Sequence, residues 1–185
     1  GVCPITKFDC EGFAVRIAGE VKGFDPLDYA SKKDLKKMDY HIQYALAAAE
    51  FGLREAGLDD TEDRFYHPDR MGTVIGSGIG GLNMMELHHR TLLNRGSGKV
   101  SPFFIPGLII TEAAGWVSIK FDLRGPNSAT CTACTTGAHA IGDAFKIVSR
   151  GAADVMVAGG TEGVVCALAI DGFAAMRSLS TRNDE

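Results

Sequence analysis

The sequence predicts an α/β fold, and three observations lead to this prediction. Short runs of apolar or small β-branched residues, typical of buried strands, occur at residues 71–75, 127–132 and 154–158. Segments with helical periodicity lie between these runs, so strands and helices alternate as in layered α/β domains. The 185 residues include 45% hydrophobic side chains, which is enough for the sizeable core of one domain.

The first half of the chain predicts a strand, a long helix and a second strand. Residues 13–21 alternate enough to indicate a strand. Residues 31–57 predict one helix, with Ser31 as its N-cap and Gly57 as its C-terminal cap. Residues 71–75 form a short apolar strand that ends in glycines. The long helix is predicted from an apolar stripe made of Met38, Ile42, Ala45, Leu46, Ala49, Leu53 and Ala56.

The second half of the chain continues the alternation. We expect, in order, a helix, a proline-flanked loop, a helix, a strand, a helix, a strand and a short helix, at residues 82–94, 101–106, 109–121, 127–132, 138–147, 154–158 and 173–177. No repeat, low-complexity tract or linker divides residues 1–185. The polar residues at 181–185 and the absence of an initial Met suggest a segment of a larger protein.

Cys134 lies at the junction between the strand over 127–132 and the helix over 138–147. Free backbone N–H groups and the dipole at a helix N-terminus stabilise a thiolate. The helix is rich in Ala and Gly, so it can pack deep inside a domain and place the thiol in a buried pocket. These properties suit a nucleophile for acyl transfer. On local chemistry alone, a small core cysteine remains an equally open interpretation.

The composition argues against several classes of function. A net charge of −4 argues against general nucleic-acid binding. The sequence contains no apolar run long enough to span a membrane and no visible signal peptide. The five cysteines lack the spacing of a disulfide framework, which favours a reducing compartment, either the cytoplasm or a reducing organelle interior.

The residues around Cys134 decide between the two interpretations. The sequence TACTTG at 132–137, preceded by LRGP at 123–126, resembles the nucleophile segment of the β-ketoacyl-acyl-carrier-protein synthases of the thiolase superfamily. Other stretches match the type II, elongating branch in order and spacing, namely KMD at 37–39, IQY at 42–44, IGSGIGG at 75–81, SPFF at 101–104, ADVMVAGG at 153–160 and LSTRND at 179–184. The resemblance covers nearly the whole chain.

This resemblance implies a fold and a reaction. The fold would be the thiolase-like α-β-α-β-α layering, of which residues 1–185 are most of the N-terminal half, without its first strand and helix and without the C-terminal half. The full-length protein would be a 3-oxoacyl-acyl-carrier-protein synthase. Cys134 would take the acyl group as a thioester, and decarboxylated malonyl-carrier protein would attack it. The chemistry implied needs no redox or metal cofactor.

The resemblance also implies roles for particular residues. The residues matching family positions around the acyl channel are Ile79, Phe104, Ala133, Ala169 and Phe173, and Ala169 stands where glycine is common. The residues matching positions that contact acyl carrier protein are Lys33, Lys36, Lys37 and Lys99, a positive patch that would attract an acidic partner. The family pairs the strand at 127–132 across a two-fold axis, which implies a homodimer in which Phe104 reaches the neighbour's channel.

Two motifs favour other functions, but only weakly. The glycines at 76–81 fit the G-x-G-x-x-G dinucleotide pattern, but no acidic residue lies between Glu86 and Glu112 to hold a ribose. The pair Cys131 and Cys134 fits C-x-x-C. If Cys131 lies on an extended strand, the two Cα atoms are roughly 9–10 Å apart, whereas a disulfide needs less than about 7 Å. The chain also lacks a second pair of Cys or His with zinc-ligand spacing.

The histidines give no clear partner for Cys134. His139 lies five residues along the helix, roughly 140° around its axis, so a structural role is expected for it. The family's catalytic histidines and lysine come from the C-terminal half, so residues 1–185 alone are expected to be inactive. Two alternatives stay open: a polyketide-type ketosynthase or other thiolase-like acyltransferase, and a non-catalytic subunit that shapes a partner's pocket. The presence of Cys134 counts against the second.

Overall fold

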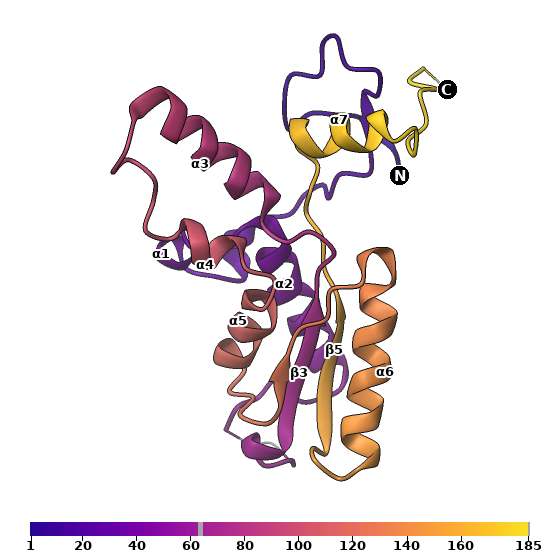
Figure 1. Cartoon of the computed structure of the whole chain (residues 1–185). Coiled ribbons are helices and arrows are strands. Elements are labelled where there is room, and N and C mark those ends of the chain that lie inside the picture. Colours follow the sequence, from indigo (N-terminus) through magenta and orange to yellow (C-terminus); the bar gives the residue numbers. More distant parts are fainter. Residues whose placement is uncertain (63–64, 185) are drawn as a thin grey trace.

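The computed structural model describes residues 1–62 and 65–184 and has a parallel three-stranded sheet at its centre (Figure 1). The central strand β3 (Met71–Gly76) pairs with β4 (Asn127–Ser128) on one side and with β5 (Val155–Gly160) on the other. In the register, Thr73 lies opposite both Asn127 and Val157. Every residue of β3 is buried, as expected for a strand covered on both faces.

Helices cover both faces of this sheet (Figure 1). On one face, α2 (Tyr40–Glu55) and α5 (Glu112–Lys120) pack against each other and against the strands. On the other face, α6 (Thr136–Ser149) packs along β3 and β5. The predicted α/β class is confirmed. The larger core cluster lies on the α2–α5 face and includes Met38, Ile42, Leu46, Leu53, Met71, Ile75, Val117 and Leu123.

The predicted single helix over 31–57 is wrong, because the chain forms two helices there. A short α1 (Lys32–Leu35) is followed by a break, and α2 then begins at Tyr40. Ser31 caps α1 as predicted, and Asp39 caps α2. The buried Asp39 carboxylate accepts the N–H of Met84 at 2.7 Å. An aspartate at an N-cap satisfies free N–H groups and so starts a new helix inside a continuous apolar stripe.

Two further elements differ from the prediction. The strand expected over 13–21 is reduced to β2 (Ile17–Ala18), which pairs antiparallel with β1 (Cys3–Pro4). The loop expected over 101–106 contains α4 (Phe104–Leu108). Pro106 is compatible with this helix because it lies in the first turn, where its missing N–H has no intrahelical acceptor.

The other predicted elements are present, but their extents differ, and the short helix expected over 173–177 begins six residues earlier, as α7. Gly57 follows α2 with a φ of +68° and so ends it as predicted. The strand expected over 127–132 has only the two exposed residues of β4, so it is neither long nor buried in this chain. The remaining elements are η1 (Pro26–Asp28), η2 (Pro68–Arg70), α3 (Leu82–Arg95), η3 (Ala133–Thr135) and α7 (Ala167–Ala175). No helix within the described ranges is long and apolar enough to cross a membrane.

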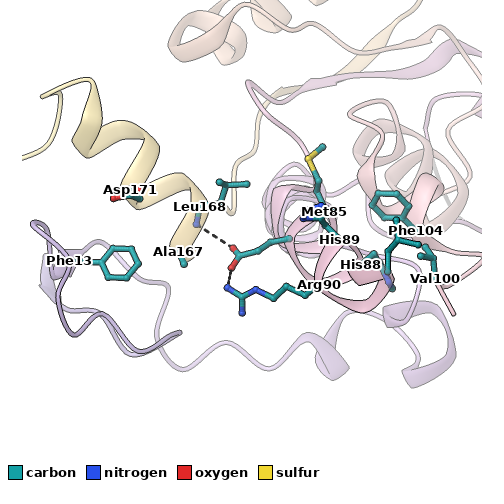
Figure 2. A pocket seen from close by; sticks show the side chains of 12 residues that line it. Phe13, Met85, His88, His89, Arg90, Val100, Phe104, Ala167, Leu168 and Asp171 are labelled. Carbon is teal, nitrogen blue, oxygen red and sulfur yellow. Dashed lines mark hydrogen bonds and ion pairs between the residues drawn. The ribbon is translucent and has the colours of Figure 1, made fainter. Parts of the chain in front are cut away.

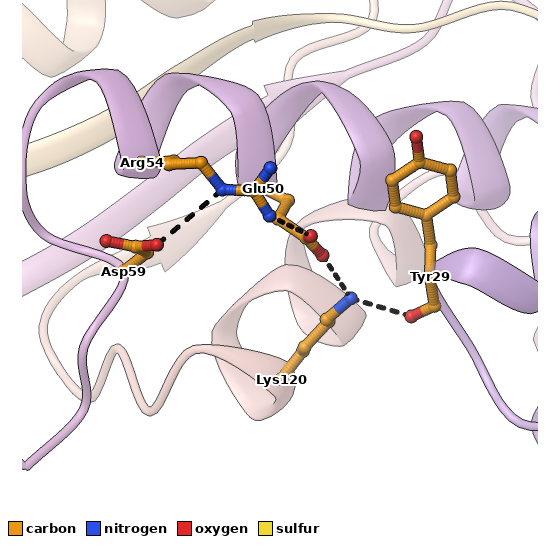
Figure 3. A network of polar contacts seen from close by, with 5 residues as sticks. All are labelled: Tyr29, Glu50, Arg54, Asp59 and Lys120. Atoms are coloured by element: carbon orange, nitrogen blue, oxygen red, sulfur yellow. Dashed lines mark hydrogen bonds and ion pairs between the residues drawn. The ribbon is translucent and has the colours of Figure 1, made fainter.

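A polar network joins α2 to α5 and to the segment before α1 (Figure 3). The Glu50 carboxylate accepts from Lys120 and from Arg54, each at 2.7 Å. Lys120 also donates to the backbone oxygen of Tyr29 at 2.7 Å, and Arg54 lies 3.7 Å from Asp59. Isolated surface pairs contribute little, but Glu50 and Lys120 are mostly buried and link three segments of the chain.

Candidate active site

Cys134 lies in the single turn η3, which leads directly into α6. The residue before it, Ala133, has a φ of +51°. A left-handed backbone costs an L-residue roughly 1–2 kcal/mol, and strain of this kind tends to cluster at functional sites. Cys134 is exposed in this chain, so the expectation of a buried thiol is wrong here. The turn presents the thiol outward instead of into the core.

Thr136 holds this turn together from the start of α6. Its side chain is buried, and its Oγ1 accepts the N–H of Thr132 at 2.9 Å while donating to the carbonyl of Ala133 at 2.7 Å. Thr130 Oγ1 donates to the backbone oxygen of Thr136 at 3.1 Å. The unusual conformation of Ala133 is therefore fixed by side-chain hydrogen bonds on both sides of Cys134.

Cys134 lines a cavity of about 500 Å³ at the carboxyl ends of β3 and β5. The sequence-predicted acyl-pocket residues Ile79, Ala133 and Phe173 also line it. Glycines let its walls approach closely: a Cβ on Gly160 would lie 3.0 Å from the Cα of Gly137. Ligands of parallel α/β sheets commonly bind at this edge, so an acyl chain attached to Cys134 would find an apolar cavity beside it.

The other two predicted acyl-pocket residues do not line this cavity. Phe104 begins α4 and lines a second cavity, of about 700 Å³, that lies between α3 and α7. In Figure 2, Phe104 lies beside His88, with Phe13 on the opposite side of the opening, and the Phe104 and His88 rings have centroids 5.2 Å apart. Ala169 is buried within α7. Within one chain, the structure brings together three of the five residues.

Glu162 is a residue of this cavity that the sequence did not single out. It follows β5, and its carboxylate accepts hydrogen bonds from Ser77, Gly78 and Ile79 at 2.9, 3.1 and 3.0 Å. The available signal was its position, since polar residues directly after buried parallel strands gather at the carboxyl edge of the sheet. Its partners lie more than 80 residues away in the sequence, so no local pattern predicts the pairing.

The predicted docking lysines fall into two groups. Lys33 and Lys36, at α1, and Lys99, after α3, are exposed. Lys37 is partly buried: its Nζ donates to Asp34 at 2.8 Å and lies 5.4 Å from the centre of the Trp116 ring. Lys37 is therefore already engaged within the chain and offers less charge to a partner than the sequence suggested.

The glycine loop at 76–81 packs against backbone. A Cβ on Gly81 would lie 2.4 Å from the oxygen of Gly107 and 2.7 Å from the Cα of Leu108. The space in which a dinucleotide phosphate would approach Gly81 is thus taken up by the chain itself. Cys131 and Cys134 are both free thiols, and the described residues contain no cluster of side chains that could hold a metal ion.

The histidines have other surroundings. His139 is exposed and its Nε2 lies 3.7 Å from the carboxylate of Asp143, one turn along α6. His41 is buried in α2. Burial lowers the pKa of His41, while the Asp39 and Glu162 carboxylates and the backbone of Ile109 oppose this shift more weakly.

The chain is similar to known condensing enzymes over its whole length. It is 49% identical to 3-oxoacyl-[acyl-carrier-protein] synthase 2 of Coxiella burnetii and 50% identical to that of Vibrio cholerae, covering 100% of this chain and 44% of each relative. A crystal structure of a beta-ketoacyl synthase from Burkholderia phymatum superposes with a TM-score of 0.84 at 31% identity, covering 100% of this chain and 45% of that one. The chain thus spans less than half the length of these proteins.

These likenesses confirm the resemblance and the thiolase-like α/β fold inferred from the sequence. The family model described as "Beta-ketoacyl synthase, N-terminal domain" matches residues 3–185. Because this match covers nearly every residue, the chain belongs to the β-ketoacyl synthase N-terminal domain family.

Proposed function

We propose that the protein containing this chain is a 3-oxoacyl-acyl-carrier-protein synthase that elongates fatty acids. The observation that carries the proposal is the placement of Cys134, on a strained turn beside a cavity lined by Ile79 and Phe173. Relatives with this name are 49–50% identical over the whole chain. The thiol is exposed, which leaves it open to an acyl donor.

The reaction proceeds in two steps. The Sγ of Cys134 attacks the carbonyl carbon of an acyl thioester, and the carrier thiol leaves with the proton. A malonyl thioester then loses CO₂, and the electron pair left on its α-carbon attacks the acyl-Cys134 carbonyl. Cys134 leaves as a thiolate and takes up a proton from water, which restores the thiol for the next acyl group. The backbone N–H of Cys134 lies in the first turn, where N–H groups lack intrahelical acceptors, so it is suited to donate to the oxyanion.

The acyl groups arrive on an acyl carrier protein in this proposal. The supporting feature is the group of exposed lysines formed by Lys33, Lys36 and Lys99 on a chain of net charge −4. A local positive patch steers an acidic partner and sets its orientation more than its final affinity. Lys37 follows Lys36 in the sequence and is held within the chain by its contacts with Asp34 and Trp116.

A homodimer is the second part of the proposal. Strand β4 is an edge of the sheet, and both of its residues are exposed. Unpaired edges promote association with another strand, and a two-fold axis beside β4 would pair it with its own copy. Sedimentation of the full-length protein should give twice the monomer mass; a fully active monomer would rule this part out.

Mass spectrometry tests the nucleophile. The full-length protein is treated with an acyl-carrier-protein thioester or with a thiol-reactive epoxide, and the modified peptide is identified. The label should lie on Cys134, and Cys134→Ala should abolish both labelling and condensation. Cys131→Ala is the matched control, because Cys131 is also exposed, and this variant should still be labelled on Cys134. Label on Cys131 or Cys166 would overturn the assignment.

A further inference from the structure

The loop at residues 77–80 is held from one side by the carboxylate of Glu162. Oε1 accepts from the Ser77 hydroxyl at 2.9 Å, and Oε2 accepts from the backbone N–H groups of Gly78 and Ile79 at 3.1 and 3.0 Å. Ser77 in turn accepts the N–H of Gly80 at 2.9 Å. One side chain at the end of β5 thereby organises a complete turn that follows β3.

The same loop contacts the nucleophile turn on its other side. A Cβ on Gly78 would lie 3.2 Å from Oε2 of Glu162 and 3.3 Å from the oxygen of Ala133, so the glycine allows the loop to pack closely against both. The Sγ of Cys131 donates to the oxygen of Gly78 at 3.6 Å. The loop is therefore clamped between Glu162 and the turn that carries Cys134.

The consequence concerns Ile79, whose side chain lines the cavity beside Cys134. Its backbone N–H is bound directly by Glu162. Hydrogen bonds to an ionised acceptor are stronger than neutral ones, and two of them at adjacent N–H groups define the direction of the loop. Without the carboxylate, the loop keeps its contact with Ala133 but loses the partner that fixes Ile79.

We propose that Glu162 is a positioning residue that fixes Ile79 in the wall of the cavity and thereby sets which acyl chains the site accepts. Glu162 acts through the loop and contacts no reacting atom. This inference rests on the proposed function, because it assumes that the acyl group attached to Cys134 lies in this cavity. The proposed role predicts that substitution of Glu162 changes the selectivity among acyl donors and leaves the reactivity of the Cys134 thiol nearly unchanged.

The experiment uses the full-length protein and a series of saturated acyl-carrier proteins of increasing chain length. In Glu162→Ala, the ratio of kcat/KM between the best and the worst donor should fall about tenfold, the effect of losing roughly one net charge-assisted hydrogen bond. The rate at which iodoacetamide alkylates Cys134 should change less than about twofold, because the nucleophile turn keeps its own hydrogen bonds to Thr136.

A double-mutant cycle with Ile79→Ala separates positioning from general destabilisation. If Glu162 acts through Ile79, then Glu162→Ala should change the selectivity ratio little when Ile79 is already Ala. Additive effects, or an unchanged ratio in Glu162→Ala, would overturn the inference. Should Glu162→Ala fail to fold, Glu162→Gln, which keeps an oxygen for the two N–H groups, should show a smaller loss of selectivity in the same direction; no loss there also overturns it.

The controls distinguish this inference from the proposed function. Glu112→Ala removes a carboxylate from the first turn of α5 and should leave the selectivity ratio unchanged. A wild-type protein that neither condenses acyl groups nor accepts a label on Cys134 contradicts the proposed function itself. A wild type that condenses, with a Glu162→Ala variant of identical selectivity, contradicts only the role of Glu162.

Discussion

The Oγ1 of Thr136 lies 2.7 Å from the carbonyl oxygen of Ala133, across the turn that contains Cys134. The same Oγ1 accepts the N–H of Thr132, so one hydroxyl bridges both ends of the turn. This bridge holds the backbone on either side of Ala133, whose φ is +51°. The conformation of the proposed nucleophile thus depends on a residue that carries no reactive group.

Replacing Thr136 with Val tests this dependence, because Val keeps the shape of Thr and lacks its hydroxyl. We expect the alkylation rate of Cys134 to fall about tenfold and the free energy of unfolding to fall by about 1–3 kcal/mol, the worth of two net hydrogen bonds. Thr136→Ser should restore most of both. Alkylation of Cys134 is monitored by mass spectrometry at matched pH. Equal rates in Thr136→Val and Thr136→Ser would show that the hydroxyl is not needed.

The alternation of elements could be predicted because it depends on local periodicity. Strands β3 and β5 and helices α3, α5 and α6 appear within a few residues of their expected ends. The break before α2 could not be predicted from the apolar stripe. Asp39 is the N-cap of α2, and its carboxylate is also held by the N–H of Met84, which lies far away in the sequence. Strand β4 ends at Ser128 and the nucleophile turn begins at Ala133, so the small and β-branched residues between them do not continue the ladder that their types suggested.

The site was predictable only where it depends on neighbouring residues. Cys134, Ala133 and the glycine loop are visible in the sequence as motifs. The positive φ of Ala133 is not visible, since nothing in the residue type demands it. Glu162 was missed because its partners lie in the loop after β3, and this loop meets the end of β5 only once the two strands have paired. Phe104 lies apart from Cys134 within one chain, which is consistent with the proposed role of a second copy.

The contact between α6 and β5 predicts the effect of Gly160→Ala. The added Cβ would lie 3.0 Å from backbone atoms of Gly137, so the helix that carries the nucleophile turn must shift. We expect a loss of about 1–3 kcal/mol in the free energy of unfolding and slower labelling of Cys134. Gly52→Ala is the control: nothing lies within 4 Å of the added Cβ, so the melting temperature should be unchanged or slightly raised. An equal effect of both substitutions would contradict the close packing.

Charge reversal tests the docking lysines. The double variant Lys33→Glu and Lys36→Glu should weaken binding of acyl carrier protein about tenfold at low salt, because both side chains are exposed and carry the local positive charge. The effect should shrink in high salt, where exposed charges are screened. Lys22→Glu, an exposed lysine outside this group, is the control. Affinity is measured by calorimetry. Unchanged affinity at low salt would mean that Lys33 and Lys36 are ordinary solvated side chains that do not bind acyl carrier protein.

We expect the burial of His41 to reduce the stability of the folded state in mild acid. Burial lowers its pKa below the ordinary value of 6.5, so the folded state resists the proton that the unfolded state accepts. Above pH 6.5 the residue is neutral in both states and has no effect; as the pH falls below 6.5, stability is lost until the folded pKa is reached. In His41→Gln the fall in melting temperature between pH 7 and pH 5 should be smaller, whereas His139→Gln, at an exposed site, should keep the wild-type slope. Equal slopes in all three proteins would place the acid sensitivity elsewhere.

Residues 1–185 expressed alone should not condense acyl chains. Neither His41 nor His139 faces Cys134, since one is buried in α2 and the other pairs with Asp143. His67 caps η2, and His88 and His89 line the separate cavity between α3 and α7. None of these histidines lines the cavity beside Cys134, so we expect no imidazole there to stabilise the decarboxylating malonyl group.

The segment should also associate with itself, because α6 exposes large apolar side chains, among them Phe145 at 71%. Contiguous apolar surface of this kind is rare on soluble monomers and marks a face that another part covers. The chain covers 44% of the length of its relative from Coxiella burnetii, so we expect the surface that covers α6 to lie in the part of the full-length protein outside residues 1–185.

Slow labelling of Cys134 should persist in the segment, because the turn and its hydrogen bonds to Thr136 are local. The assay compares decarboxylative condensation by this segment with that of the full-length protein at equal thiol concentration. Comparable turnover would mean that the proton-handling groups lie within residues 1–185, against the expectation from the family resemblance that they lie in the C-terminal half.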